Sequence, residues 1–307
     1  MLCCLSVVGA LYGAMYLLLR ERKLPTVVMR VWFTVHLFVS LIVVNVGCHV
    51  FSFLTSPLHV MPIGTAQALS RSLKHVVFKY FFAPAIPHVH RVEMPGSLPF
   101  SVLKSGAVCA CHCSFFDPLL FLFTAPLSFL WRGATFFKSS LLNLPLFGYV
   151  LKCTGYFPVY FANENSPSFH VNKEKQAAVV ADVEAWLGKG NNMCFFPEGV
   201  MNRDPAVLTD FRLGSFNMIL AHKTPLYYFV FYGDHEVWSP SWKGLPGFPA
   251  DIYTYVGKYE YDPAKEDAHS LSVGLRAEMQ SRLDDMLAKR KEREYKPWYV
   301  APQKKEL

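Results

Sequence analysis

The chain has 307 residues, of which 52% are hydrophobic and 17% are charged, and its formal net charge is +7. This length fits one medium-sized catalytic domain with an accessory segment, and the apolar share is high for a soluble protein. The positive charge favours an anionic partner, such as a lipid surface or a phosphorylated substrate. We predict no nucleic acid as a partner, because the basic residues are scattered and no aromatic and basic motif of an RNA-binding sheet occurs.

Two apolar runs open the chain. The first, Leu2 to Leu19, carries no charge and would measure about 27 Å as a helix, close to the thickness of a bilayer core. The second, Val31 to Leu54, contains only isolated polar residues, and Arg20-Glu21-Arg22-Lys23 lies between the two. A cleaved signal peptide would carry a positive charge ahead of its apolar run, and this chain does not. We therefore interpret residues 1–60 as a membrane-anchoring helical hairpin.

Beyond the hairpin, short apolar runs alternate with amphipathic segments. This alternation predicts an α/β fold with a mixed, mostly buried sheet flanked by helices. We assign residues 61–295 to this catalytic domain and residues 296–307 to a C-terminal tail. Strand regions are predicted over Val102–Cys111, Tyr149–Tyr160, Met193–Phe196 and Thr224–Tyr232. Helices are predicted over Pro118–Phe123, Val171–Leu187 and Ser270–Leu287.

A histidine and an aspartate follow the first predicted strand, as His112 and Asp117. Five positions of a helix turn through about 500°, so the two side chains can meet only if they lie in a loop before the next helix. An aspartate bonded to one ring nitrogen fixes the histidine tautomer and leaves the other nitrogen free to accept a proton. We therefore predict that His112 is a general base oriented by Asp117.

A second motif, Phe196-Pro197-Glu198-Gly199, follows the short predicted strand Met193–Phe196. Open α/β sheets bind their ligands at the carboxyl ends of strands. The two motifs, which lie 86 residues apart (198 minus 112), are therefore expected to converge on one cleft. A glutamate at a buried strand end needs a partner, which favours a functional role for Glu198 over that of an ordinary turn residue.

Two other kinds of site deserve consideration near His112. Cys109, Cys111 and Cys113 alternate around it, but alternate residues of one strand do not surround a metal, and no second pair stands at zinc-ligand spacing. We therefore predict no metal site and buried thiols in a reduced, cytosol-facing domain. Ser114 would allow a Ser-His-Asp hydrolase, but the chain has no G-x-S-x-G elbow, which favours local hydrogen bonding for this serine.

Together these motifs resemble those of the glycerolipid acyltransferases, a family best known through the 1-acylglycerol-3-phosphate acyltransferases. His112 and Asp117 match the H-x-x-x-x-D block, and residues 196–199 match the F-P-E-G block. Three further segments resemble family blocks in the family's order: Lys138 to Gly148, Gly155 to Val159, and Thr224-Pro225-Leu226. The resemblance covers roughly residues 102–233.

The resemblance implies a membrane-bound enzyme that moves an acyl chain from acyl-CoA to the free hydroxyl of a lysophospholipid. The expected reaction converts 1-acylglycerol 3-phosphate to phosphatidate, with acyl-CoA as co-substrate and no cofactor. His112 would take the proton of the lipid hydroxyl as its oxygen attacks the thioester. The closest alternative is an acyltransferase for lysophosphatidylcholine or lysophosphatidylethanolamine. A lipid esterase and a non-catalytic lipid-binding membrane protein are alternatives from other classes.

The resemblance also implies which residues bind substrate. These are Glu198 with its neighbours Pro197 and Gly199, and Gly155 of the second block. Apart from the resemblance, Lys138, Arg203 and Arg212 are candidate cations for the phosphate groups of the acceptor or of CoA.

The sequence departs from the family at the end of the second block. That block usually ends with an arginine that holds the acceptor's phosphate, but Tyr160 and Phe161 occupy this end here. Arg203 and Lys138 are the candidates to replace the missing cation. Cys111 also stands where the family commonly has an asparagine before the histidine.

The chain ends in Lys304-Lys305-Glu306-Leu307, which resembles the dilysine retrieval signal of endoplasmic-reticulum membrane proteins and loosely resembles a luminal KDEL-type tail. The charge bias of residues 20–23 places that turn in the cytosol, so two full spans would send the catalytic domain to the lumen. We nevertheless expect a cytosol-facing domain at the endoplasmic reticulum, because acyl-CoA is made in the cytosol and the short helices can lie partly in one leaflet.

Overall fold

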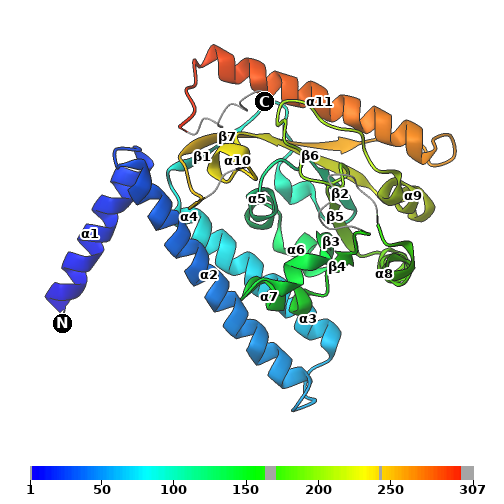
Figure 1. The fold of residues 1–307 in the computed structure, drawn as a ribbon, viewed down its shortest axis with the longest axis horizontal. Helices are drawn as coiled ribbons and strands as arrows, with labels where there is room; N and C mark the ends of the chain where they lie inside the picture. The colour runs from blue at the N-terminus through cyan, green and yellow to red at the C-terminus, as the bar shows by residue number, and fades with distance from the viewer. Residues whose placement is uncertain (1, 163–170, 242–243, 299–307) are drawn as a thin grey trace.

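The computed structural model describes residues 2–162, 171–241 and 244–298, so the predicted retrieval signal lies outside the described residues. A seven-stranded sheet forms the centre of the molecule, in the order β1-β7-β6-β2-β5-β3-β4 (Figure 1). Its strands are β1 (Val89–Glu93), β2 (Ala107–Ala110), β3 (Gly133–Lys138), β4 (Phe157–Val159), β5 (Asn192–Phe195), β6 (Leu226–Tyr232) and β7 (Ala250–Tyr259). All neighbouring strands are parallel except β6 and β7. The predicted mixed α/β sheet is confirmed.

Helices lie on both sides of this sheet. The helices of the N-terminal part are α1 (Leu2–Arg20), α2 (Thr26–Thr55), α3 (Ile63–Val77) and α4 (Ala83–Ala85), with a π-helical turn over Phe78–Phe82. The remaining helices are α5 (Asp117–Thr124), α6 (Leu127–Trp131), α7 (Phe147–Thr154), α8 (Lys173–Gly188), α9 (Leu213–His222), α10 (Asp234–Val237) and α11 (Ala268–Glu292). Short 3-10 helices cover Phe100–Val102 and Ser139–Asn143. In Figure 1, α9 and α11 cover one face of the sheet, whereas α2, α3 and α5 to α7 lie on the other.

The predicted elements agree with the structure except at two places. The strand predicted from Val102 begins only at Ala107. Residues 100–102 form a 3-10 helix, and Gly106, just before the strand, has a positive φ of 134°. The strand region predicted over Tyr149–Tyr160 is wrong in its first half, because residues 147–154 form α7 and only 157–159 form β4. A short apolar run fits a buried helix as well as a buried strand, so the sequence pattern could not separate them.

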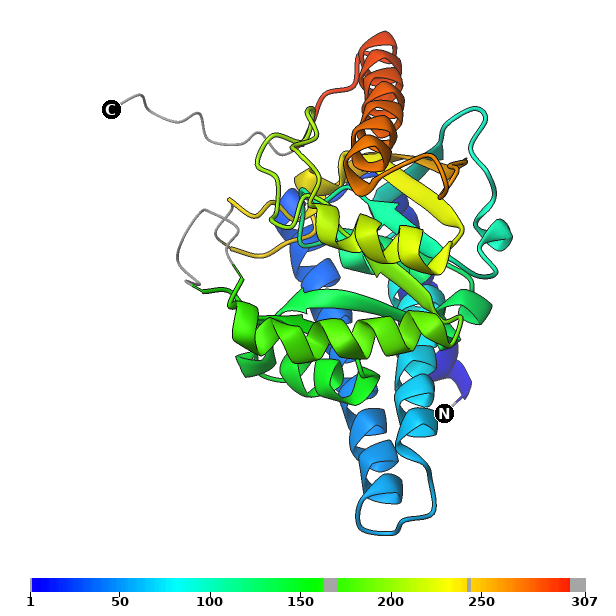
Figure 2. The same ribbon diagram turned by 90° about the vertical axis from the view of Figure 1, so that its right-hand side faces the viewer.

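The N-terminal helices differ in arrangement from the predicted hairpin. Helices α1 and α2 meet at a tight turn and diverge, whereas α3 runs antiparallel along α2, and the tip of this pair protrudes from the domain (Figures 1 and 2). Phe33, Val44 and Cys48 of α2 are fully buried in the same core cluster as the sheet. The opposite side of α2 exposes a continuous apolar surface: Val31, Val35, Phe38, Val39, Ile42, Val43, Val46, Val50 and Phe53.

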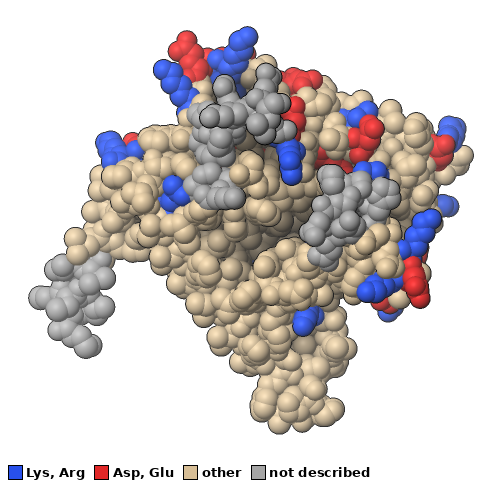
Figure 3. Space-filling model, viewed as in Figure 1, with Lys and Arg blue, Asp and Glu red and all other residues tan. Residues whose placement is uncertain are grey.

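Helix α2 is the one candidate membrane span among the described helices, by its length and composition. Figure 3 shows that the tip of the α2–α3 pair carries no charged side chain on the face in view. The turn before α2, in contrast, is charged and bonded to the domain. Arg22 in this turn donates to Asp251 of β7 at 2.6 Å and to the carbonyl oxygens of His88 and Ala250. The basic turn is therefore fixed to the sheet domain.

Candidate active site

The residues singled out by the sequence gather at one edge of the sheet. Strands β6, β2, β5 and β3 are consecutive and parallel, so their carboxyl ends lie side by side. Asp234 follows β6, His112 follows β2, Glu198 follows β5, and Lys138 is the last residue of β3. The two sequence motifs converge as expected, because the backbone N–H of His112 donates to Glu198 Oε1 at 3.1 Å.

His112 and Asp117 form a hydrogen-bonded pair. The distance from His112 Nδ1 to Asp117 Oδ2 is 2.8 Å, and the same oxygen accepts the backbone N–H groups of Cys113 (2.8 Å) and Ser114 (2.9 Å). The loop from 112 to 116 curls around the carboxylate because Asp117 is the first residue of α5 and Pro118 suits the first helical turn. This is the loop geometry that the spacing predicted. It turns Nδ1 toward the acid and leaves Nε2 without a hydrogen-bond partner among the described residues.

Burial sets the protonation of this pair. Burial lowers the pKa of His112 to about 4, although the charges of Glu198 and Asp234 oppose the shift. Burial also raises the pKa of Asp117 to about 7, against the hydrogen bonds that stabilise its anion. At slightly alkaline pH the imidazole is therefore neutral and the aspartate ionised, which is the state in which Nε2 can accept a proton.

An aromatic ring covers the imidazole. Phe196 stacks on His112 with 4.2 Å between ring centroids and 22° between ring planes. The sequence assigned Phe196 to a strand end and to the F-P-E-G block but did not predict this contact. The available signal was the adjacency of β2 and β5, because their pairing brings the segments that follow the two strands together.

Glu198 is 1% exposed and both its carboxylate oxygens are engaged by the protein. Oε1 accepts the backbone N–H of His112, while Oε2 accepts from Asn202 Nδ2 (2.8 Å) and from both the N–H (3.1 Å) and the hydroxyl (2.8 Å) of Thr209. Asn202 in turn donates its own N–H to the carbonyl oxygen of His112 at 2.7 Å. Glu198 therefore connects the loop after β5 to His112, and it could contact a substrate only by exchanging one of these bonds.

The neighbours of Glu198 shape the turn. Gly199 has φ of 75°, a left-handed conformation that favours glycine, and its N–H donates to the carbonyl oxygen of Phe196 at 3.1 Å. The carbonyl oxygen of Pro197 accepts the N–H of Arg212 at 2.7 Å. These contacts account for the turn chemistry of the F-P-E-G motif, and the predicted substrate contacts of Pro197 and Gly199 remain predictions.

Ser114 occupies a structural position. Its hydroxyl lies 2.8 Å from the carbonyl oxygen of Trp238 and accepts the N–H of Phe116 at 2.9 Å. The side chain is fully buried. A serine nucleophile needs its hydroxyl on the histidine that activates it, and this hydroxyl is directed elsewhere. The local hydrogen bonding expected from the sequence is what the geometry supports.

The three alternate cysteines face different neighbours. Cys109 Sγ contacts Met279, Cys111 Sγ lies 3.5 Å from the carbonyl oxygen of Phe231, and Cys113 Sγ lies 3.2 Å from Asp234 Oδ2. They do not converge on one point. Among the described residues, Cys113, Asp234 and His235 form the only group with three metal-ligand atoms within 4.8 Å of one another. A zinc site would need these three plus a water, and the reaction class indicated by the His112 and Asp117 pair needs no metal.

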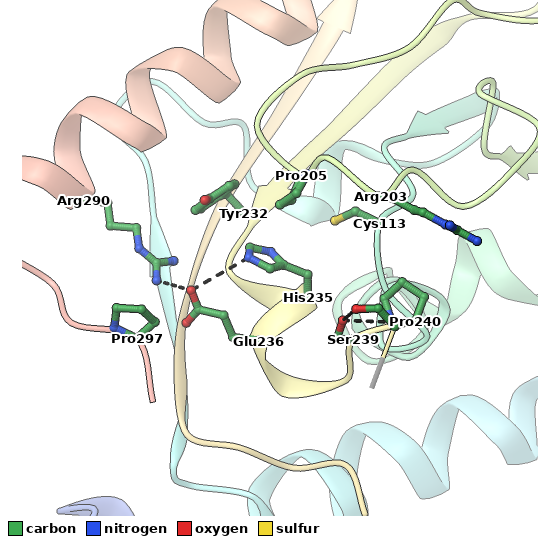
Figure 4. Close-up of a pocket in the computed structure, with 11 residues that line it drawn as sticks. Cys113, Arg203, Pro205, Tyr232, His235, Glu236, Ser239, Pro240, Arg290 and Pro297 are labelled. Atoms are coloured by element: carbon green, nitrogen blue, oxygen red, sulfur yellow. Dashed lines mark hydrogen bonds and ion pairs between the residues drawn. The ribbon is translucent and has the colours of Figure 1, made fainter. Parts of the chain in front are cut away.

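A cavity of about 370 Å³ opens beside Cys113. Figure 4 shows Arg290 of α11 directed at Glu236 of α10, with the ring of His235 next to that ion pair. Arg203 lies on the opposite side of the cavity, on the loop that follows the F-P-E-G motif. Its side chain is exposed, so the guanidinium is accessible to an anionic ligand at the rim.

Lys138 and Gly155 lie on the side of the candidate site formed by β3 and β4. The ammonium group of Lys138 lies 5.5 Å from the centre of the Phe161 ring, so the cation of β3 lies near the residues that end the second block. Gly155 ends α7 with φ of 66°, and a Cβ there would come within 2.5 Å of the Gln67 side chain in α3. This close approach gives Gly155 a packing role, and its predicted substrate contact remains a prediction.

Comparison with known proteins agrees with this geometry. Residues 91–231 match the family described as Acyltransferase. The comparison with curated proteins finds no similar sequence. Among solved structures, the chain is similar to the 1-acyl-sn-glycerophosphate (LPA) acyltransferase PlsC from Thermotoga maritima, with a TM-score of 0.61 and 15% identity over 88% of this chain and 98% of that chain. At this identity the likeness shows a shared fold.

Proposed function

We propose that the chain, whose residues 91–231 match the acyltransferase family, is a membrane-bound acyl-CoA-dependent O-acyltransferase that acylates a lysophospholipid. The proposed reaction converts 1-acylglycerol 3-phosphate to phosphatidate. Acyl-CoA is a co-substrate, and the residues of the proposed reaction call for no cofactor. The PlsC to which the fold is similar acts, by its name, on 1-acyl-sn-glycerophosphate.

The observation that carries this proposal is the hydrogen bond between His112 and Asp117. His112 has its Nδ1 bonded to Asp117, its ring face covered by Phe196, and its Nε2 free to take a proton. In the proposed mechanism Nε2 accepts the proton of the lipid hydroxyl while the hydroxyl oxygen attacks the thioester carbon. The C–S bond then breaks, the ester forms, and the proton passes from His112 to the departing sulfur of CoA. Asp117 stabilises the imidazolium that exists between these two steps.

Two cations support an anionic acceptor. Lys138 stands at the carboxyl end of β3 and contacts Phe161, where the family usually has its phosphate-binding arginine. Arg203 is exposed at the rim of the cavity beside Cys113. A cation bonded to a phosphate contributes roughly 1.5–3 kcal/mol, enough to separate a phosphate monoester from a neutral lipid. We propose Lys138 or Arg203 as the acceptor's phosphate ligand.

The N-terminal helices support the proposed attachment to a membrane. The exposed apolar side of α2 would lie in the lipid, while its buried side remains packed on the domain. Because Arg22 is bonded to Asp251 of β7, the basic turn and the catalytic domain lie on the same side. The preference of basic turns for the cytosol supports a cytosol-facing domain, and we propose that α2 and α3 enter one leaflet and return. Residence in the endoplasmic reticulum stays a prediction.

A direct assay tests the proposal. Purified protein in detergent or vesicles is given acyl-CoA and, separately, 1-acylglycerol 3-phosphate, lysophosphatidylcholine, lysophosphatidylethanolamine or no acceptor, and both CoA and lipid products are measured. We expect acceptor-dependent CoA release that is largest with 1-acylglycerol 3-phosphate and lost in His112→Ala. Fatty-acid release from lipid without CoA-ester consumption would indicate an esterase instead. Full activity in a folded His112→Ala protein would reject the mechanism.

A further inference from the structure

A second buried carboxyl group lies beside the catalytic pair. Asp234 is the first residue of α10 and follows β6, just as His112 follows the neighbouring strand β2. Asp117 and Asp234 are both fully buried, and both contact Cys113. The backbone N–H of Cys113 donates to Asp117 Oδ2 at 2.8 Å, and its Sγ lies 3.2 Å from Asp234 Oδ2, so the two carboxyl groups are close enough to interact. Two carboxylates in this arrangement cannot both be ionised without a large energetic cost, so one proton is expected to be shared between them.

The hydrogen bonds of the two side chains leave one oxygen of each without a partner. Asp117 Oδ2 accepts from three groups, but its Oδ1 is buried and has no hydrogen-bond partner among the described residues. Asp234 Oδ2 lies 3.2 Å from Cys113 Sγ, and its Oδ1 is likewise buried and unpartnered in the described structure. A proton on one carboxyl group would turn these two lone acceptors into a donor and an acceptor.

The unequal surroundings decide which residue carries the proton. Asp117 receives one imidazole N–H and two backbone N–H groups, which stabilise its negative charge. Among the described residues, the one hydrogen-bond donor to the Asp234 carboxyl is the weak thiol donor of Cys113. Burial, followed by the neighbouring charge of Asp117, raises the pKa of Asp234 well above its usual range.

We infer that Asp234 is a positioning residue, protonated at neutral pH, whose carboxylic acid donates a hydrogen bond to Asp117 and so holds Asp117 ionised and aimed at His112. The titratable groups around this pair are His112, Glu198, His235, Glu236, Tyr232 and the thiols of Cys111 and Cys113. The inference rests on the proposed function for its kinetic consequence. The protonation of Asp234 can be measured without any catalysis.

Infrared spectroscopy measures that protonation directly. Protein carrying carbon-13 in its aspartate carboxyl groups is examined at slightly alkaline pH, where Asp117 is ionised and a protonated Asp234 gives a C=O band separate from the carboxylate bands. We expect this band in the wild type and its loss in Asp234→Asn. Glu236→Gln, which changes another buried carboxyl group, is the matched control and should keep the labelled band. Absence of the band from folded wild-type protein would overturn the inference.

Kinetics separate a hydrogen-bond donor from mere packing. Asparagine keeps an N–H donor for Asp117 Oδ1, so Asp234→Asn should retain a kcat close to wild type. Asp234→Ala leaves that buried anion without its donor and should lower kcat roughly 10- to 100-fold with little change in the KM for acyl-CoA. Equal losses of kcat in the two variants, at equal thermal stability, would contradict a donor role.

The pH profile supplies a readout that packing alone would not move. The donor proton of Asp234 is lost as pH rises through its raised pKa, so the wild type should lose activity at alkaline pH. Asp234→Asn cannot lose that proton and should keep its activity there. An unchanged alkaline limb in Asp234→Asn would count against the inference.

Metal analysis excludes the competing role of Asp234 as a ligand. Cys113 and His235 stand close enough to share a metal ion with it. Stoichiometric zinc in the purified wild type that disappears in Asp234→Asn would overturn the inference, whereas its absence from active protein agrees with a shared proton. If no lysolipid is acylated, the proposed function fails, and the infrared band still decides the state of Asp234.

Discussion

The imidazole of His112 lies flat against the ring of Phe196, 4.2 Å from centroid to centroid. The histidine is thereby fixed in two independent ways, because Asp117 holds its edge and Phe196 holds its face. The face contact also removes water from one side of the base, which strengthens its electrostatic interactions. Phe196 of the F-P-E-G motif therefore helps to position His112, the proposed base.

Replacing Phe196 with leucine tests this contact. An aromatic pair is worth about 0.5–1.5 kcal/mol beyond its buried area, so Phe196→Leu should lower kcat by up to roughly tenfold. The neighbouring Phe195 is the matched control, since it packs against Phe216 in the core. Phe195→Leu should lower the thermal unfolding temperature while the folded enzyme keeps its kcat. Steady-state kinetics with melting curves of both variants separate the two effects.

Asp117→Asn tests the carboxylate that accepts three hydrogen bonds at Oδ2. An amide oxygen can replace only part of this acceptor, and a rotated amide presents N–H groups to donors. We expect a loss of 10²- to 10⁴-fold in kcat, in the range for a disabled general base. Circular dichroism and thermal melting should report a folded protein. A folded variant with more than a tenth of wild-type activity would show that His112 does not depend on this carboxylate.

The pH dependence follows from the raised pKa of Asp117. Because burial raises this pKa to about 7, the carboxylate is lost as pH falls through that value, and kcat should fall with it. The imidazole does not set this limb, since burial lowers the pKa of His112 to about 4. A raised carboxyl pKa also means that stability is lost as pH rises from the unfolded pKa toward about 7. Asp117→Asn should therefore gain thermal stability relative to wild type as pH rises across this window, as melting curves at several pH values will show.

Glu198→Gln tests whether Glu198 has a structural role or binds the lysolipid acceptor. If Glu198 acts through its bonds to His112, Asn202 and Thr209, the amide must oppose at least one of these donors with its own N–H groups. An unsatisfied buried donor costs about 1–3 kcal/mol, so thermal stability and kcat should both fall, while the two KM values change little. If Glu198 binds the acceptor, as the family resemblance implies, the KM for the lysolipid should rise selectively. Initial rates over both substrate concentrations, with melting curves, decide between these outcomes.

The sequence predicted the sheet class, the loop that joins His112 to Asp117 and the convergence with Glu198, because each depends on local patterns or on a general property of parallel sheets. Asp234 could not be predicted in the same way. It lies 117 residues from Asp117 (234 minus 117), and only the pairing of β6 with β2 brings the two together. The packing of α2 along α3 could not be predicted either, because an apolar helix has the same composition whether it faces lipid or protein.

Lys138→Ala tests the replacement of the missing phosphate ligand. If the ammonium of Lys138 binds the acceptor's phosphate next to Phe161, its loss should raise the KM for 1-acylglycerol 3-phosphate by roughly 10- to 150-fold, the equivalent of 1.5–3 kcal/mol. Acceptors without a phosphate monoester should be little affected. Lys152→Ala, at an exposed lysine of α7, is the matched control for net charge and should change neither value.

Arg203→Ala under the same assay tells which cation is used. A rise in the KM for 1-acylglycerol 3-phosphate confined to this variant would assign the phosphate to the cavity beside Cys113, where Arg203 lies, rather than to the end of β3. If neither substitution changes selectivity and the wild type prefers lysophosphatidylcholine or lysophosphatidylethanolamine, the proposed acceptor is wrong. The chemistry of His112 and Asp117 would stand in that case, because the bond between them and the free Nε2 do not depend on the headgroup.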